Sequence, residues 1–119
     1  MVDDCPDTRE LYAEYLELSG YDVKEAGDGM SAVQEAVRSA PDVVVMDMSL
    51  PGIDGREAAL RLRAEERTRG IPVVMVSGFA PDAAVHGGAQ DAPWDAYLGK
   101  PCLPDDLVGA IERLLAPRS

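Results

Sequence analysis

The sequence predicts one α/β domain in which helices cover both faces of a parallel sheet. Segments with the period of strands alternate along the chain with segments of helical period, which is the pattern of parallel strands joined by helical crossovers. Two strand segments, residues 43–46 and 71–76, are continuous apolar runs rich in Val, as expected for strands covered on both faces. The length of 119 residues, with 46% hydrophobic and 28% charged residues, fits one doubly wound globular domain.

The first strand is the weak point of this prediction. Only Met1 and Val2 precede the first acidic residues, whereas a strand usually has about five residues. Either the strand is a short stub, or residues that belong upstream of it are absent from the chain. A stub is expected to weaken the centre of the sheet and to lower the stability of the domain.

Three elements follow in the N-terminal half. Residues 7–18 have helical spacing, and their apolar residues Leu11, Tyr15 and Leu18 share one face. Residues 21–26 alternate as a short strand. Two glycines then interrupt the chain, and residues 31–39 return to helical spacing. This order of helix, strand and helix supports the alternating architecture.

The middle of the chain holds the two apolar strands. The run at 43–46 ends at Asp47, and a loop leads to a helix predicted over residues 56–66. The run at 71–76 ends at Ser77. Each buried strand therefore ends in a polar side chain.

The last third is less regular. Residues 80–94 predict a short or mobile helix, because two glycines each cost about 1 kcal/mol relative to Ala inside a helix. Tyr97 and Leu98 predict a final strand before Lys100. Residues 103–116 predict an amphipathic helix whose inward side chains are Leu107, Ile111, Leu114 and Leu115.

Charge and composition exclude several classes of partner. The 22 acidic and 11 basic residues give a net charge of -11, which repels nucleic acid and anionic lipid surfaces, so we expect neither to bind directly. No apolar run is long enough to cross a bilayer, and the N-terminus lacks the pattern of a signal peptide, so we expect a cytoplasmic protein. Cys5 and Cys102 form no metal-ligand motif and are expected to be free thiols.

Polar residues gather at the ends of the predicted strands. They are Asp3 and Asp4 after the first strand, Asp47 after the third, Ser77 after the fourth and Lys100 after the fifth. The carboxyl ends of parallel strands share one edge of the sheet, so these side chains should meet there. Carboxylates that lie close together repel one another unless a cation neutralises them, and oxygen ligands without Cys or His favour Mg²⁺.

A magnesium ion beside a lysine suits phosphoryl transfer, which depends mainly on positioning and on neutralisation of charge. Lys100 can lie against Asp47 and against an incoming phosphoryl group. The carboxylate of Asp47 can act as a nucleophile, so the simplest chemistry at this edge is formation of an aspartyl phosphate.

Four strings at the strand ends carry a family resemblance: VDD at 2–4, DMSLPGIDG at 47–55, MVSG at 75–78 and YLGKP at 97–101. Together they resemble the receiver domain of two-component response regulators, over essentially all of residues 1–119 except the start of the first strand. The resemblance implies a flavodoxin-like sheet of five parallel strands in the order 2-1-3-4-5. It also implies a cis peptide bond between Lys100 and Pro101.

The resemblance further implies a role for each residue of this edge. Asp47 is similar to the phosphoacceptor, and Lys100 is similar to the lysine that pairs with the phosphate. Asp3 and Asp4 are similar to the metal-binding pair, and Ser49 is similar to the position whose backbone carbonyl completes the magnesium shell. Ser77 and Tyr97 are similar to the switch hydroxyl and the switch aromatic, the two side chains that move on phosphorylation.

The resemblance implies a signalling domain that catalyses only its own phosphorylation and dephosphorylation. A histidine kinase or histidine phosphotransfer protein would supply the phosphoryl group, and a downstream protein or output domain would respond. Pairing with a second copy of the chain, as a homodimer, is a further alternative. Phosphorylation would pull the Ser77 hydroxyl inward and let the Tyr97 ring move, so that the surface around the last two strands changes shape.

Two alternatives remain beside this interpretation. A haloacid dehalogenase-type phosphatase also uses an aspartyl nucleophile and Mg²⁺, but it requires a second aspartate where this chain has Ser49. A receiver-like scaffold that never takes phosphate would act through its surface alone, and the short first strand keeps this alternative open.

Overall fold

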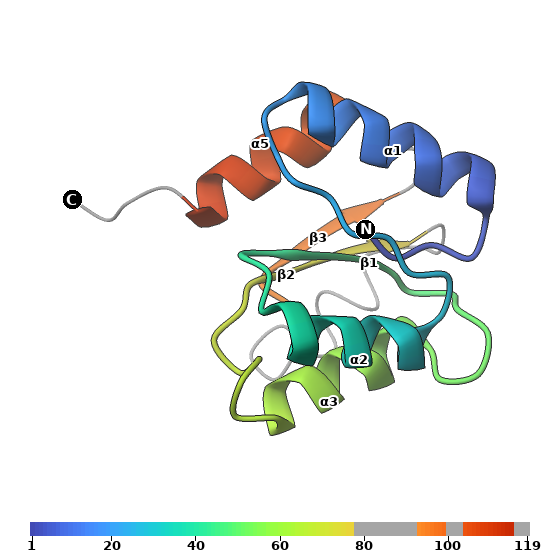
Figure 1. The fold of residues 1–119 in the computed structure, drawn as a ribbon, viewed down its shortest axis with the longest axis vertical. Coiled ribbons are helices and arrows are strands. Elements are labelled where there is room, and N and C mark those ends of the chain that lie inside the picture. Colours follow the sequence, from blue (N-terminus) through green and yellow to red (C-terminus); the bar gives the residue numbers. More distant parts are fainter. Residues whose placement is uncertain (78–92, 100–103, 116–119) are drawn as a thin grey trace.

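The computed structural model describes residues 1–77, 93–99 and 104–115 (Figure 1). The helices and strands are, in chain order, α1 (Pro6–Leu18), α2 (Gly29–Ser39), β1 (Val44–Asp47), α3 (Gly55–Ala64), β2 (Val73–Ser77), β3 (Ala96–Gly99) and α5 (Pro104–Leu115). The predicted α/β class and the two predicted apolar strands are confirmed. The expected element at 80–94 lies mostly outside the described residues, as do Lys100, Pro101 and Cys102.

The sheet is parallel and covered on both faces. Its strands lie in the order β1-β2-β3, with Val44 opposite Val73 and Val74 opposite Ala96. Helices α1 and α5 lie on one face, and α2 and α3 lie on the other (Figure 1). This is the doubly wound arrangement that the alternating pattern predicts.

Side chains alternate between the two layers along each strand. Met46 and Met75 belong to the core beneath α2 and α3, where they meet Leu62. Val45 and Val74 point to the other core, together with Leu16 of α1 and Leu107 and Ile111 of α5. Because neighbouring strand residues face opposite ways, a strand buried on both faces is apolar along its length, here up to the polar residue that ends each strand.

The N-terminal segment joins this sheet at one residue only. Val2 forms isolated parallel bridges to Ala26 on one side and to Met46 on the other. The strand predicted at 21–26 is therefore wrong as a strand, because a single-residue stub offers it a partner only at Ala26. The neighbours of Val2 agree with the expected order 2-1-3, but the strands of the described residues number three rather than five.

The face of α1 was predicted wrongly. Leu11 and Leu18 are 60% and 81% exposed, whereas Ala13 and Leu16 are buried. Leu16 packs with the half-buried Tyr12 against the core beneath α1 and α5. The helix thus presents a second, smaller apolar stripe to the sheet, and the spacing of the larger leucines does not reveal this.

The inward face of α5 was predicted correctly except at its end. Leu107 and Ile111 are buried and Leu114 is partly buried, but Leu115 is exposed. Leu115 borders a hollow of about 310 Å³ that is also lined by Leu16 and Tyr21. The hollow leaves the last turn of the helix with an open apolar side.

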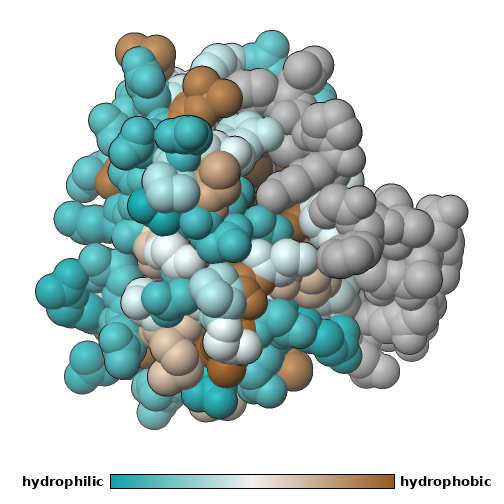
Figure 2. All heavy atoms as spheres, turned by 90° about the vertical axis from the view of Figure 1, so that its right-hand side faces the viewer, coloured by the Kyte–Doolittle hydropathy of each residue, from teal (hydrophilic) through white to brown (hydrophobic). Residues whose placement is uncertain are grey.

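Figure 2 shows a face covered mostly by hydrophilic residues, with hydrophobic residues in small separate patches. Within the described ranges, no helix combines the length and apolar character that crossing a bilayer requires. Cys5 is a free, exposed thiol, as predicted.

Candidate functional site

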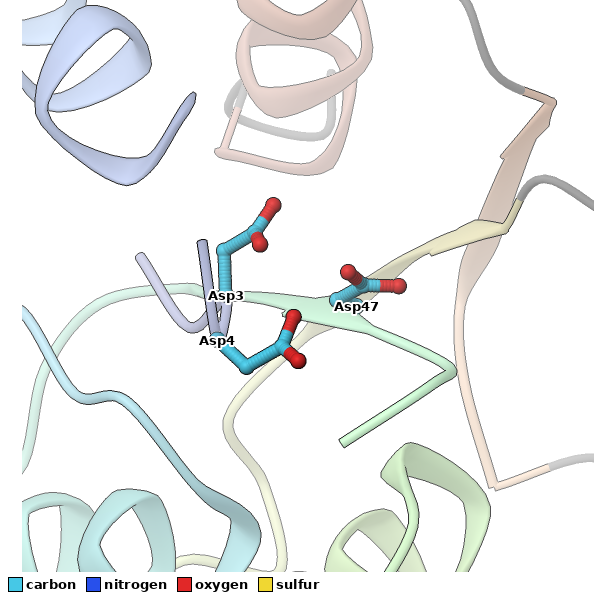
Figure 3. Close-up of side chains that lie close together, drawn as sticks. All are labelled: Asp3, Asp4 and Asp47. Carbon is cyan, nitrogen blue, oxygen red and sulfur yellow. The ribbon is translucent and has the colours of Figure 1, made fainter. Parts of the chain in front are cut away.

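Three carboxylates converge at one end of β1. Asp3, Asp4 and Asp47 each offer an oxygen, and these oxygens lie within 4.8 Å of one another (Figure 3). Asp3 and Asp47 are only 1% and 4% exposed, whereas Asp4 is open to solvent. The predicted cluster of Asp3, Asp4 and Asp47 is therefore present, with two buried members and one that faces water.

Backbone pairing places the cluster. The N–H of Asp47 donates to the carbonyl of Val2 at 2.9 Å, and the N–H of Val2 donates to the carbonyl of Val45 at 2.8 Å. Asp47 ends β1, so its side chain emerges at the same edge of the sheet as the residues that follow Val2. Residues from distant parts of the chain thus meet through a single parallel bridge.

Asp3 is held at three points. Its N–H donates to the carbonyl of Ala26 at 3.2 Å, and its carboxylate oxygen Oδ1 accepts from the N–H of Cys5 at 2.9 Å. Its carbonyl accepts from the guanidinium of Arg9, also at 2.9 Å. Nothing in the sequence signalled Arg9, which lies in α1 among other charged residues and belongs to no motif.

The loop after Asp47 folds closely around its backbone. The N–H of Ser49 donates to Oδ1 of Asp47 at 3.1 Å. The N–H of Gly55 donates to the carbonyl of Met48 at 2.8 Å, and a Cβ at Gly55 would lie only 2.3 Å from the carbonyl oxygen of Asp47. A glycine is therefore required there, and the loop keeps Ser49 beside the carboxylates.

An open hollow adjoins the cluster. It has a volume of about 460 Å³ and is lined by Asp4, Met48, Ser49, Leu50, Pro51 and Asp54. Asp54 also caps α3, where its side chain accepts a hydrogen bond from the N–H of Glu57 at 2.8 Å. The rim of carboxylates thus opens onto a space bordered by polar and apolar groups.

Two other predicted residues, Ser77 and Tyr97, lie on the strands β2 and β3. Ser77 ends β2, is buried, and is the residue after the partner of Asp47 in the ladder, so it lies at the same edge. Tyr97 lies inside β3, half-buried, where it packs on Trp94 with ring centroids 5.5 Å apart. Lys100 lies outside the described residues.

A further polar contact borders the cluster. The Thr8 hydroxyl donates to Sγ of Cys5 at 3.4 Å and lowers the pKa of this thiol. Cys5 is the N-cap of α1, the residue after the acidic pair. Its side chain is not part of the group of carboxylates that converges there among the described residues.

This donor set fits Mg²⁺. Three carboxylates in one pocket repel one another, and a divalent cation removes that repulsion. Hard oxygen donors without His or Cys are the set that Mg²⁺ takes, and Mg²⁺ usually keeps water or phosphate oxygens in its remaining positions. The exposed Asp4 and the adjoining hollow leave room for such ligands.

Comparison with known proteins agrees with the geometry. Residues 1–112 match the family described as the response regulator receiver domain. The DNA-binding dual master transcriptional regulator RpaA of Synechocystis is 36% identical over 115 residues, which cover 97% of this chain and 47% of RpaA. The phosphate regulon transcriptional regulatory protein PhoB of Pseudomonas aeruginosa is 35% identical, over 97% of this chain and 50% of PhoB. The chain spans about half the length of these relatives.

Solved structures are similar over nearly the whole chain. The receiver domain of the sensor histidine kinase PA1611 of Pseudomonas aeruginosa, with a magnesium ion in its active site cleft, has a TM-score of 0.86 at 28% identity and covers 98% of this chain and 94% of that one. The response regulator TrrA of Thermotoga maritima, in complex with Mg²⁺ and BeF, has a TM-score of 0.81 at 28% identity, over 96% of this chain and 95% of that one.

Proposed function

The chain belongs to the response regulator receiver domain family, and from this premise we propose that it is a phosphoacceptor whose Asp47 is phosphorylated in the presence of Mg²⁺. The observation that carries the proposal is the convergence of three carboxylates, from two distant parts of the chain, within 4.8 Å at the carboxyl edge of the sheet. The family defines the type of domain. The convergence supports the choice of these residues.

The metal would be held by Asp3, Asp4 and Asp47, with the backbone carbonyl of Ser49 as a further ligand. When bound, Mg²⁺ neutralises charge on the carboxylates and on the transferred phosphoryl group. Asp3 and Asp47 are held in place by backbone hydrogen bonds, so this part of the site is preorganised. Asp4 is the solvent-facing member and can adjust to the ion.

The carboxylate of Asp47 would attack the phosphorus of a phosphohistidine on a histidine kinase or phosphotransfer protein. A P–O bond forms to Asp47, the P–N bond of the donor breaks, and the released imidazole nitrogen takes a proton from solvent. Asp47 is only 4% exposed, which limits the access of water to the phosphorus atom and so limits competing hydrolysis. Lys100 would pair with the transferred group.

Signalling would follow from movement of Ser77 and Tyr97, on the strands β2 and β3. The Ser77 hydroxyl would donate a hydrogen bond to a phosphoryl oxygen, and the Tyr97 ring would move as Ser77 moves. Tyr97 already contacts Trp94, whose ring lies 5.9 Å from the guanidinium carbon of Arg56 at the start of α3. A movement of Tyr97 would therefore also change the contacts of Trp94 and Arg56.

We further propose that the domain is cytoplasmic and is not an enzyme toward any other substrate. Its partners would be the phosphodonor and a downstream protein or output domain. The charge of -11 argues against nucleic acid as a ligand of the domain itself, although the relatives named above are transcriptional regulators. The phosphatase alternative is disfavoured because Ser49 cannot act as the general acid of that mechanism.

Labelling with a small phosphodonor tests the proposal. The protein is incubated with acetyl phosphate and Mg²⁺, and base-labile phosphate is measured on the wild type, on Asp47→Asn and on Asp42→Asn. Asp42 is an exposed aspartate before the other end of β1, so it is a matched control. We expect label on the wild type and on Asp42→Asn, none on Asp47→Asn, and none after chelation of Mg²⁺. Label on Asp47→Asn would overturn the assignment, and absence of label throughout would favour the scaffold alternative.

A further inference from the structure

Arg9 links three segments beside the carboxylates. Its guanidinium donates to the carbonyl of Asp3 at 2.9 Å, and its Nε forms an ion pair with Glu25 at 3.2 Å. A Cβ at Gly27 would lie 3.0 Å from a terminal nitrogen of the same group, so the chain passes close beside it there. The side chain is only 21% exposed. One side chain therefore connects α1, the acidic pair and residues 25–27.

The acidic pair lies where the pairing of strands is sparse. Val2 pairs through isolated bridges, so no ladder extends from it along the chain in the described residues. The N–H of Asp3 donates over a fairly long 3.2 Å to Ala26, and the carbonyl of Asp3 accepts from Arg9. Arg9 thus supplies a charge-assisted hydrogen bond, the stronger kind, at a point where a longer strand would have a backbone N–H.

We infer that Arg9 is a positioning residue for the proposed magnesium site, one that fixes the backbone of Asp3 so that Asp3 and Asp4 reach the ion together with Asp47. The inference rests on the proposed function, since it assigns a role in the same site. Arg9 would act through the peptide of Asp3 and would not touch the metal or the phosphoryl group.

Because Arg9 is positively charged, a role through its charge and a role in positioning Asp3 predict opposite changes in Mg²⁺ affinity when Arg9 is replaced. A guanidinium close to a cation site repels the cation, and Glu25 offsets this only in part. If Arg9 acted only through its charge, its removal would tighten Mg²⁺ binding. If it positions Asp3, its removal must weaken Mg²⁺ binding, because loss of groups that orient metal ligands typically lowers affinity by about 10-fold to 100-fold.

Two substitutions separate charge from geometry. Arg9→Gln removes the charge, and Arg9→Lys keeps it but cannot hold Asp3 and Glu25 in one planar fork. We expect both variants to bind Mg²⁺ about 10-fold or more weakly than the wild type in calorimetric titration. Arg38→Gln is the matched control, because Arg38 pairs with Glu35 on α2 and is 78% exposed. Its affinity should stay within about 2-fold of the wild type.

Hydrogen exchange of the metal-free protein supplies a second readout. The amides of Asp3 and Cys5 should exchange faster in both Arg9 variants, while amides of β2 stay protected and show that the fold persists. Wild-type affinity in Arg9→Lys together with tighter binding in Arg9→Gln would overturn the inference and leave the magnesium site intact. Absence of Mg²⁺ binding by the wild type would remove the proposed function and the inference with it.

Discussion

The backbone N–H of Asp47 donates to the carbonyl of Val2 at 2.9 Å, and this bond sets the candidate phosphoacceptor beside the acidic pair. Asp3 follows Val2 directly, so the register of one bridge determines which side chains share the rim. A shift by one residue would turn the side chain of Asp47 to the opposite face of the sheet. The site therefore depends on the backbone around Asp47 as much as on the carboxylates themselves.

Substitution of Gly55 tests this dependence. In Gly55→Ala the new Cβ would lie 2.3 Å from the carbonyl oxygen of Asp47 and 2.8 Å from Cα of Met48, so the loop must move. We expect the free energy of unfolding to fall by about 1–3 kcal/mol and Mg²⁺ binding to weaken, because Asp47 is displaced. Urea denaturation and metal titration measure the two effects.

Gly70→Ala is the matched control for this substitution. A Cβ at Gly70 meets nothing within 4 Å. The control should leave Mg²⁺ affinity unchanged. Equal affinity in Gly55→Ala and in the wild type would show that Mg²⁺ binding does not depend on the close approach of Gly55 to the backbone of Asp47.

The stability of α2 should depend on pH through Asp28. Asp28 caps this helix, and hydrogen bonds from the N–H of Ser31 at 2.7 Å and from its hydroxyl at 3.1 Å lower the pKa of Asp28. A carboxyl group whose pKa is lower in the folded state stabilises the fold above its unfolded pKa of about 3.9. That contribution is lost as the pH falls through the lower, folded pKa.

Melting curves of wild type, Asp28→Asn and Ser31→Ala between neutral pH and acid check this. The advantage of the wild type over Asp28→Asn should shrink below about pH 4. Ser31→Ala removes one of the two hydrogen bonds, and the pKa of Asp28, followed by carboxyl NMR, should rise. A wild-type advantage that is constant across this range would contradict the prediction.

Ala40 offers a substitution that stabilises. It ends α2 in a left-handed conformation with φ of 47°, which costs an L-residue about 1–2 kcal/mol and glycine much less. Ala40→Gly should raise the free energy of unfolding by about 0.5–1 kcal/mol after the larger chain entropy of glycine is counted. Gln34→Gly, inside the same helix, should lower it by about 1 kcal/mol. Loss of stability in both variants would show that α2 does not end as described.

Much of the fold and of the carboxylate cluster could be predicted from the sequence. Both depend on local patterns and on the rule that the carboxyl ends of parallel strands lie at one edge of the sheet. The runs at 43–46 and 71–76 are apolar throughout, which identifies strands covered on both faces. Their polar ends, Asp47 and Ser77, then share an edge because the strands are parallel. The same rule predicted that Asp3 and Asp4 lie at this edge as well.

The features that the sequence could not supply depend on tertiary neighbours. The face that α1 buries is set by what lies beneath it, so the exposed Leu11 and Leu18 misled the spacing argument while Leu16 went unnoticed. The segment at 21–26 has the pattern of a strand but lacks a partner of matching length. Arg9 was missed because a hydrogen bond from a side chain to a backbone carbonyl leaves no pattern in a sequence.

Direct titration with Mg²⁺ tests the central claim, that the carboxylates of Asp3, Asp4 and Asp47 together hold a divalent cation. Asp4→Asn is the most informative variant, because Asp4 is exposed and its substitution should leave the fold intact. We predict that the wild type and Asp42→Asn bind one Mg²⁺ with similar affinity, and that Asp4→Asn and Asp47→Asn each bind at least about 10-fold more weakly. Equal affinity in all four proteins, or no binding by the wild type, would contradict the claim.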